Sequence, residues 1–301
     1  MSTAPALPPT NDSIIALAAR HGLKVRDEIV VENVGLDFLV AFATATNGER
    51  WVLRIPRRAD VIDRARHEAR VLQTIRPQLP VAVPDWRIHS VELIAYPRLA
   101  GTPAITMDPT SMQPIWHLDR DNPQFVETLG ACLSALHGIA HETIAAAGLP
   151  VRDIDEVRAA RVDVLDRVQR ELGIGEELSQ RWRKWLDDDR SWPSQTVMTH
   201  GDLYVAHTLI DEHSRVVGVL DWTEAAINDP TIDFIHHLVG FGEAGLDQLI
   251  AAYERHGGRT WPNMRRHVQE RQASFPLDYA LYALTTQNPE HLSSARMQLG
   301  A

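Results

Sequence analysis

Two carboxylates and a histidine, at a spacing suited to phosphate chemistry, stand in the second half of the chain. Asp202 lies in the polar segment 199–209, His207 follows five residues later, and Asp221 ends the next apolar run. Phosphoryl transfer requires one group that orients the attacking hydroxyl and two that hold Mg²⁺ on the nucleotide phosphates. The sequence therefore predicts a phosphotransferase site that these three side chains form together.

Each of these residues, taken alone, also has a structural explanation. Asp202 can cap a turn in the loop that contains His200, and Asp221 can cap the segment after its strand. A lone histidine such as His207 is more often packed in a core than bound to a metal. All three residues at this combined spacing are much less expected by chance than any one of them alone. The combination therefore favours phosphoryl transfer.

The N-terminal third of the chain contains residues that complement this site. Arg54 stands in the third of three expected strands, where a cation would point toward nucleotide phosphates. Glu68 lies on the helix expected after that strand and is a candidate partner that orients Arg54. Arginine stays charged and presents a fork of donors, so it can form this pair, although lysine is the commoner residue here.

The apolar pattern predicts the elements that position these residues. We expect a helix over 11–21, strands over 29–31, 38–44 and 51–55, a helix over 61–76, and two more strands over 81–83 and 91–95. After a linker with proline and glycine we expect mainly helices, over 122–140, 152–172, 176–189, 231–239, 244–256, 262–285 and 288–299. Short strands are expected only around 197–222, where they carry the polar cluster.

This order of elements predicts an α+β protein with two lobes. The small N-terminal lobe, with an antiparallel sheet, would span 1–95 and bind the nucleotide. A hinge at 96–101 would lead to a larger, mainly helical lobe over 102–301. This second lobe would contain the catalytic loop at 199–209 and the substrate cleft.

The composition of the whole chain excludes several classes of protein. The formal net charge of the 301 residues is −10, which disfavours nucleic acid as a partner because phosphate backbones bind clustered Lys and Arg. No apolar stretch reaches about 18 residues, so no membrane span is expected. The N-terminus lacks the pattern of a secretory signal, and the lone Cys132 cannot form an internal disulfide. We expect a monomeric protein of the bacterial cytoplasm.

Several motifs together resemble one known family. HGDLYVAH with LDW, VLRIPRR after the second hairpin, and AYPRL at the linker are similar to the macrolide 2′-phosphotransferases. These are bacterial antibiotic kinases within the aminoglycoside phosphotransferase and protein-kinase-like superfamily. The resemblance covers nearly the full length and implies a two-lobed protein-kinase-like fold.

The resemblance also implies roles for particular residues. Asp202 matches the catalytic aspartate, and His207 and Asp221 match the metal-binding pair, with His207 in place of the usual Asn. The other matched residues bind the nucleotide or support the catalytic loop: Arg54 and Glu68 (the phosphate-orienting pair), Tyr96, Pro97, Arg98 and Leu99 (the hinge that reads the nucleobase), and His200 and Asp233 (loop support). The first turn has one glycine, Gly35, instead of a GxGxxG loop, so phosphate contacts there should be few.

The implied reaction transfers the γ-phosphate of a nucleotide to the 2′-hydroxyl of the amino sugar on a macrolide, which inactivates the antibiotic. Mg²⁺ is the implied cofactor, and GTP is the implied donor, with ATP as the alternative. A second interpretation keeps the kinase but changes the acceptor to an aminoglycoside or another hydroxyl metabolite. A third, of a different class, is a catalytically weak nucleotide-binding regulatory module.

Overall fold

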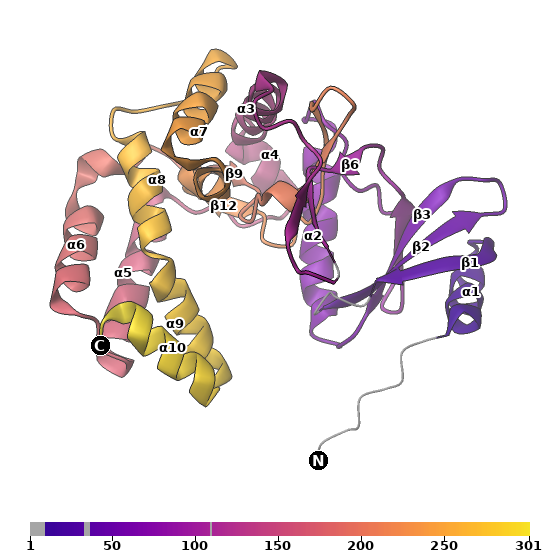
Figure 1. Ribbon diagram of the computed structural model, residues 1–301, viewed down its shortest axis with the longest axis horizontal. Helices are drawn as coiled ribbons and strands as arrows, with labels where there is room; N and C mark the ends of the chain where they lie inside the picture. Colours follow the sequence, from indigo (N-terminus) through magenta and orange to yellow (C-terminus); the bar gives the residue numbers. More distant parts are fainter. Residues whose placement is uncertain (1–9, 33–36, 109) are drawn as a thin grey trace.

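The protein has a sheet-containing part at its N-terminal end and a larger, mainly helical part beyond it (Figure 1). The structure is a computed structural model, and it describes residues 10–32, 37–108 and 110–301. The predicted α+β architecture with two lobes is confirmed. Gly35, which the sequence places near the phosphates, lies outside the described residues.

A five-stranded antiparallel sheet forms the centre of the N-terminal part, in the order β1-β2-β3-β5-β4. Its strands are β1 (Val25–Glu32), β2 (Phe38–Ala45), β3 (Arg50–Pro56), β4 (Ile88–His89) and β5 (Ile94–Pro97). The turn between β2 and β3 contains Gly48, whose φ of 89° glycine adopts without strain. Arg54 pairs with Val40 on one side and Ile94 on the other, so it lies inside the sheet.

Two helices pack against this part of the protein. α1 (Asn11–Arg20) contacts the outer strand β1, and α2 (Val61–Ile75) carries Glu68. Apolar residues near the start of α2 pack on the sheet, whereas those near its end join the main core of the helical part. The first group is Val61 and Ala65, and the second is Val71, Leu72 and Ile75. The two cores therefore meet along α2.

The predicted strand over 81–83 is wrong. These residues make a single parallel bridge, in which Ala82 exchanges hydrogen bonds of 2.9 Å with the backbone of Val217 and Val219. Pro80 and Pro84 flank the segment, and proline has no N–H to donate to a longer ladder. The fifth strand of the sheet is instead β4.

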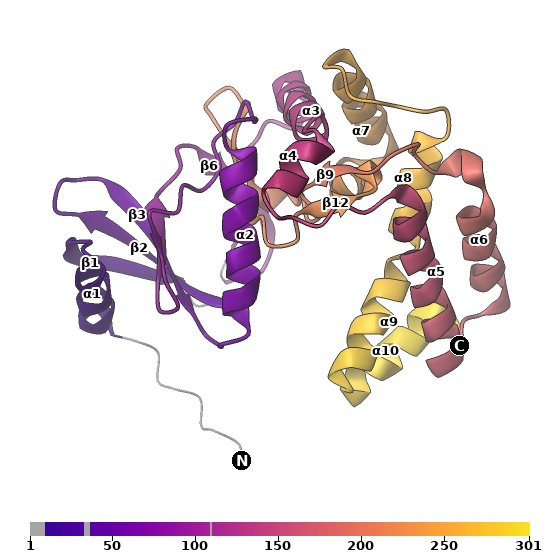
Figure 2. The same ribbon diagram turned by 180° about the vertical axis from the view of Figure 1, so that it is seen from behind.

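Most of the C-terminal part consists of helices that are 10 to 21 residues long. They are α3 (Pro123–His137), α5 (Ile154–Glu171), α6 (Glu176–Asp187), α7 (Ile235–Arg255), α8 (Met264–Ala273), α9 (Phe275–Thr286) and α10 (Pro289–Leu299), with the shorter α4 (His141–Ala146). Seen from behind, α5 and α6 lie together with α9 and α10 at the end of the molecule away from the sheet (Figure 2). This group has its own buried core, which includes Trp182, Trp185 and Leu165.

Two helix predictions differ from the structure. The helix expected over 262–285 is divided into α8 and α9 at Ser274, because Pro276 lies in the first turn of α9 and could not continue α8. The segments expected over 231–239 and 244–256 begin with a 3₁₀ turn, Pro230–Phe234, and continue as α7, which is interrupted between them as predicted. Gly242 breaks the regular geometry of α7, with φ 71° and ψ −170°.

Short strands in the helical part surround the polar cluster. β9 (Val197–Thr199) pairs with β12 (Ala226–Asn228), and β10 (Thr208–Ile210) lies between β11 (Val216–Val219) and β6 (Thr102–Pro103). A further hairpin, β7 (Ile105–Met107) with β8 (Pro114–Trp116), follows the hinge and was not predicted. Among the helices in the described part of the chain, none combines the length and apolar character that a membrane span requires.

Candidate active site

Short strands hold both ends of the loop that carries Asp202. β9 leads into the loop, and β10 leaves it after a single 3₁₀ turn, Val205–His207. Gly201 has a φ of 85°, and a Cβ at this position would lie 2.4 Å from the carbonyl oxygen of Glu224. Only glycine fits there, so the residue before Asp202 allows the loop to pass close to the neighbouring backbone.

The buried carboxylate of Asp233 fixes the first turn of this loop. It accepts hydrogen bonds from the backbone N–H of His200 at 2.9 Å and of Gly201 at 2.8 Å. His137 Nε2 lies 3.0 Å from the same carboxylate, and the Tyr253 hydroxyl lies 3.0 Å from His137 Nδ1. The Asp233 side chain is fully buried, so water cannot take its place as the acceptor.

The His200 ring connects the loop to the strand that ends before Asp221. Its Nε2 donates to the carbonyl oxygen of Leu220 at 2.9 Å, and its Nδ1 accepts from the backbone N–H of Asp202 at 3.2 Å. These contacts fix the neutral tautomer that carries the proton on Nε2. Burial lowers the pKa of His200, which keeps the ring in this neutral form.

Asp202 projects from the loop with 43% of its side chain exposed. Its Oδ1 lies 3.1 Å from Nε2 of His236, on the first turn of α7. The hydrogen bond from His236 holds the pKa of Asp202 below its ordinary value. The carboxylate is therefore ionised at neutral pH, and it can accept a hydrogen bond from an incoming hydroxyl.

His207 and Asp221 face each other next to this loop. His207 Nδ1 donates to the backbone carbonyl oxygen of Asp202 at 2.9 Å, so its Nε2 carries the lone pair. That Nε2 lies 3.8 Å from Oδ2 of Asp221. Asp221 has a positive φ of 60°, which is uncommon for a residue other than glycine and is often found at functional sites.

This pair of side chains fits Mg²⁺ when a nucleotide supplies the remaining ligands. Within the described ranges no group of three or more His, Cys, Asp and Glu side chains could hold a metal ion. Mg²⁺ usually keeps several waters and binds to one or two carboxylates together with substrate phosphates. Asp221 provides a carboxylate of that kind, and the His207 lone pair lies at a distance that allows both groups to approach one ion.

Arg54 and Glu68 form a buried ion pair on the other side of the cleft. Arg54 Nη1 lies 2.8 Å from Glu68 Oε1, and the Arg54 guanidinium stacks over the Phe38 ring at 4.2 Å. Burial opposes the positive charge, but the combined attraction of Glu68, Tyr96 and Asp221 outweighs it and raises the pKa of Arg54. Glu68 Oε2 also accepts a hydrogen bond of 3.1 Å from Thr223, so the pair is tied to the segment that follows Asp221.

A cleft of about 470 Å³ lies between the sheet and the polar loop. Of the predicted residues, the cleft brings together those from both lobes: Arg54, Tyr96, Arg98, Leu99, His207 and Asp221. Apolar side chains such as Phe42, Val52 and Leu209 line its inner end. Mostly apolar walls with a few convergent polar groups are typical of cofactor sites. Asp202 does not line this cleft but lies beside it, next to His207.

The residues predicted to form the hinge present few backbone donors to this cleft. Pro97 has no N–H, and the N–H of Arg98 donates to the carbonyl oxygen of Arg50 at 2.7 Å. Tyr96 is paired with Val52 in the sheet. The Arg98 guanidinium lies 4.8 Å from the centre of the Phe42 ring, so these two side chains cover the apolar end of the cleft together.

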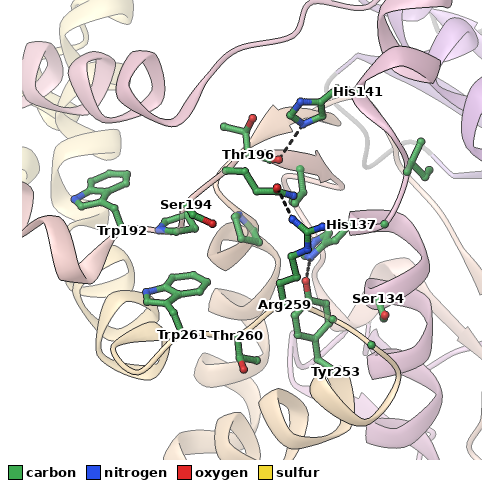
Figure 3. Close-up of a pocket in the computed structure, with 18 of the residues that line it drawn as sticks. Ser134, His137, His141, Trp192, Ser194, Thr196, Tyr253, Arg259, Thr260 and Trp261 are labelled. Atoms are coloured by element: carbon green, nitrogen blue, oxygen red, sulfur yellow. Dashed lines mark hydrogen bonds between the residues drawn. The ribbon is translucent and has the colours of Figure 1, made fainter.

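A second cavity, of about 1030 Å³, lies in the helical part and contains none of the residues predicted for the site (Figure 3). Its walls come from α3, from the segment before β9 and from the connection between α7 and α8. The side chains around it include His137, Tyr253 and Arg259. This cavity is larger than the cleft, but Asp202, His207 and Asp221 all lie outside it.

Three residues that contact the site were not predicted from the sequence. His236 lies three residues after Asp233 on the same helical segment, so helical spacing could have indicated that both reach the loop. Thr223 is two residues beyond Asp221, and its contact with Glu68 depends on how α2 is placed. His137 is nearly a hundred residues from its partner Asp233, and no local pattern connects them.

Comparison with known proteins identifies the class. Residues 30–267 match the model of the phosphotransferase enzyme family, and the chain belongs to that family. The fold is therefore kinase-like, and the protein is an enzyme that transfers a phosphoryl group to a hydroxyl, as predicted.

The chain is similar in particular to two solved macrolide 2′-phosphotransferases. One is MphH from Brachybacterium faecium, with 44% identity, a TM-score of 0.90, and coverage of 96% of this chain and 97% of that one. The other is a type I enzyme with 45% identity, a TM-score of 0.88, and 96% of each chain covered. The Bacillus subtilis (strain 168) protein YcbJ is 43% identical over 95% of both chains. The predicted resemblance to macrolide 2′-phosphotransferases is thus confirmed.

Proposed function

We propose that the protein transfers the γ-phosphate of a nucleoside triphosphate, with GTP preferred, to the 2′-hydroxyl of the amino sugar of a macrolide. Phosphorylation at this position would inactivate the antibiotic. The observation that carries the proposal is the identity of 44% over nearly the full length with a macrolide 2′-phosphotransferase. The position of Asp202, His207 and Asp221 at the edge of one cleft supports it.

In this proposal the residues of the cleft bind the nucleotide. The apolar inner end, between Phe42 and Leu209, receives the base, and Arg54 contacts the phosphates while Glu68 keeps it in place. Asp221 and His207 would hold Mg²⁺, which would supply positive charge beside the phosphate oxygens. Thr223 and the Arg54–Glu68 pair link the two sides of the cleft, so the phosphate contacts and the metal-binding segment stay aligned.

Asp202 acts on the acceptor. Its carboxylate accepts the hydrogen bond of the 2′-hydroxyl and holds the oxygen in line with the γ-phosphorus. As the new oxygen–phosphorus bond forms, the bond to the leaving nucleoside diphosphate breaks, and the hydroxyl proton passes to Asp202. Asp233 and His200 keep the loop in one conformation, so the carboxylate is positioned before the acceptor arrives.

The hinge supports a preference for GTP. Guanine presents two adjacent donors, N1–H and N2–H₂, beside its O6 acceptor, whereas adenine presents one donor, N6–H₂, beside its N1 acceptor. A segment with few N–H groups but several carbonyl groups therefore matches more of the guanine edge. Neither Pro97 nor Arg98 has a backbone N–H left for a base. One unmatched buried polar group costs about 1–3 kcal/mol, so kcat/KM should favour GTP by about ten- to a hundredfold. Equal values for GTP and ATP with one macrolide would refute this argument about the hinge.

The surroundings of Asp202 include aromatic side chains that suit an acceptor with a large apolar ring. The His236 ring beside Asp202 contacts the rings of Tyr204 and Phe275, with centroids 5.7 and 6.1 Å away. Tyr204 and Phe275 are 39% and 37% exposed, which is high for large apolar side chains. These exposed aromatic faces give a surface on which the apolar ring of a macrolide can pack.

The decisive experiment combines purified protein with Mg²⁺, GTP or ATP, and an erythromycin-type macrolide, followed by mass spectrometry. We expect one added phosphate per macrolide. A macrolide whose 2′-hydroxyl is blocked by an acetyl group is the matched control and should gain none. Asp202→Ala should lower the rate by about 10²–10⁴ while it still binds nucleotide. Phosphorylation of an aminoglycoside but not of the macrolide would overturn the proposed acceptor.

A further inference from the structure

The two oxygens of the Asp202 carboxylate have different surroundings. Oδ1 lies 3.1 Å from Nε2 of His236. Oδ2 lies 3.8 Å from Nδ1 of His207, and that nitrogen already donates its hydrogen to the Asp202 carbonyl oxygen at 2.9 Å. One oxygen is therefore occupied, and the other is left to accept a new hydrogen bond.

His236 is itself held firmly in position. It follows the 3₁₀ turn that contains Asp233, so one short segment contacts both the backbone and the side chain of the catalytic loop. The rings of Tyr204 and Phe275 pack on the imidazole, and 27% of its side chain is exposed. A ring confined by two aromatic neighbours has few alternative orientations, so its Nε2 stays directed at Asp202.

We propose that His236 is a positioning residue that holds Oδ1 of Asp202, so that Oδ2 receives the acceptor hydroxyl. This inference rests on the proposed function, since it takes Asp202 as the group that accepts the proton. The acceptor oxygen bonds to the γ-phosphorus, the nucleoside diphosphate leaves, and the proton passes to Oδ2. Without His236 the carboxylate can rotate about its Cβ–Cγ bond, and fewer encounters have the productive orientation.

The test compares two substitutions at this position. Groups that orient a functional side chain in metal sites contribute about ten- to a hundredfold, and we expect His236→Ala to lower kcat by the same factor. The KM for the nucleotide should stay within about twofold, because His236 does not line the nucleotide cleft. His236→Gln keeps an N–H donor at similar reach and should recover most of the lost kcat. If the Gln variant is as slow as the Ala variant, orientation by a hydrogen bond is refuted.

A matched control removes the histidine that caps the C-terminal end of the same helix. His256, at the C-terminal end of α7, lies 2.8 Å from Glu127 and forms the same kind of pair away from the catalytic loop. His256→Ala should leave kcat unchanged. Thermal unfolding of each variant confirms that the protein is folded at the assay temperature. If His256→Ala is as slow as His236→Ala, then removing a histidine–carboxylate pair at either end of α7 lowers kcat. That result would overturn the proposal.

A double-mutant cycle separates this inference from the proposed function. If His236 acts through Asp202, then His236→Ala should add no further loss in an Asp202→Ala background, measured by single-turnover rates. Losses that simply add would overturn the positioning role. A near-normal rate for Asp202→Ala would overturn the proposed function itself. A slow Asp202→Ala with a fully active His236→Ala would overturn only the inference.

Discussion

The substitution Asp233→Asn tests how the catalytic loop is held. In the native protein the two carboxylate oxygens accept from the backbone N–H groups of His200 and Gly201, and His137 Nε2 lies 3.0 Å from Oδ2. An asparagine keeps the shape but replaces one oxygen with an NH₂ group, which cannot accept. In the better orientation the amide nitrogen faces Gly201 and leaves one buried donor unpaired, at a cost of about 1–3 kcal/mol.

The remaining contacts of Asp233 also become weaker, because hydrogen bonds to an ionised group are about twice as strong as neutral ones. The total loss should therefore be about 2–5 kcal/mol of unfolding free energy. Because the unpaired donor lies in the residue before Asp202, kcat should also fall. We expect a loss of about ten- to a hundredfold, the size of effect found when a residue that orients a metal ligand is mutated.

Urea unfolding and steady-state kinetics on the same preparation measure both effects. Leu165→Ala is the control, because it truncates a fully buried side chain in the separate core formed by α5, α6, α9 and α10. It should lower the free energy of unfolding by about 2–5 kcal/mol. Its folded fraction should keep the parent kcat. If Asp233→Asn loses stability but has the kcat of the control, the carboxylate stabilises the fold without positioning the loop, and the reasoning is refuted.

Two other predictions concern the metal ligands and pH. Asp221→Asn should require far more Mg²⁺, whereas His207→Asn should be tolerated because its amide oxygen suits Mg²⁺; titration of Mg²⁺ against rate decides, and an inactive His207→Asn at all concentrations would contradict it. Burial lowers the pKa of His237 to about 4 in the folded protein, from about 6.5 in the unfolded chain. Above about pH 6.5 the histidine is neutral in both states. Between about pH 6.5 and pH 4 it gains a proton only in the unfolded chain, which stabilises the unfolded state. Stability should fall by about 2 kcal/mol from pH 7 to pH 5 through this group. Urea unfolding should show that His237→Phe loses that part of the pH dependence; an equal slope would refute it.

Much of the geometry of the candidate site was predictable because its residues are close together in sequence. Asp202 and His207 share one loop, which leads into β10, and Asp221 comes shortly after β11, the strand that pairs with β10. The relative positions of these residues therefore follow from a local sequence pattern. Arg54 and Glu68 were also predictable as partners, since a strand followed by a helix brings them to 2.8 Å. Their individual roles in catalysis stay predictions until the variants are measured.

What the sequence could not indicate depends on contacts between distant segments. His137 meets Asp233 only because α3 packs beside α7, and no propensity records that contact. The segment 81–83 is a short apolar run of the kind that predicts a strand, but Val81 and Val83 pack into the helical core instead of the sheet. Local patterns thus predicted the elements better than they predicted the partners.

The division of α2 between two cores limits how the chain could be cut. Val71, Leu72 and Ile75 are buried in the main core of the helical part, although they precede the hinge in sequence. A fragment of residues 1–95 would expose these three side chains, an apolar stripe on α2, to water. The complementary fragment would have an unfilled cavity in its core at the site that they occupy. Each fragment would therefore be prone to aggregate alone, and the stripe would be the surface through which the two reassemble. We therefore expect that the predicted boundary at 96–101 does not separate two independently folding units.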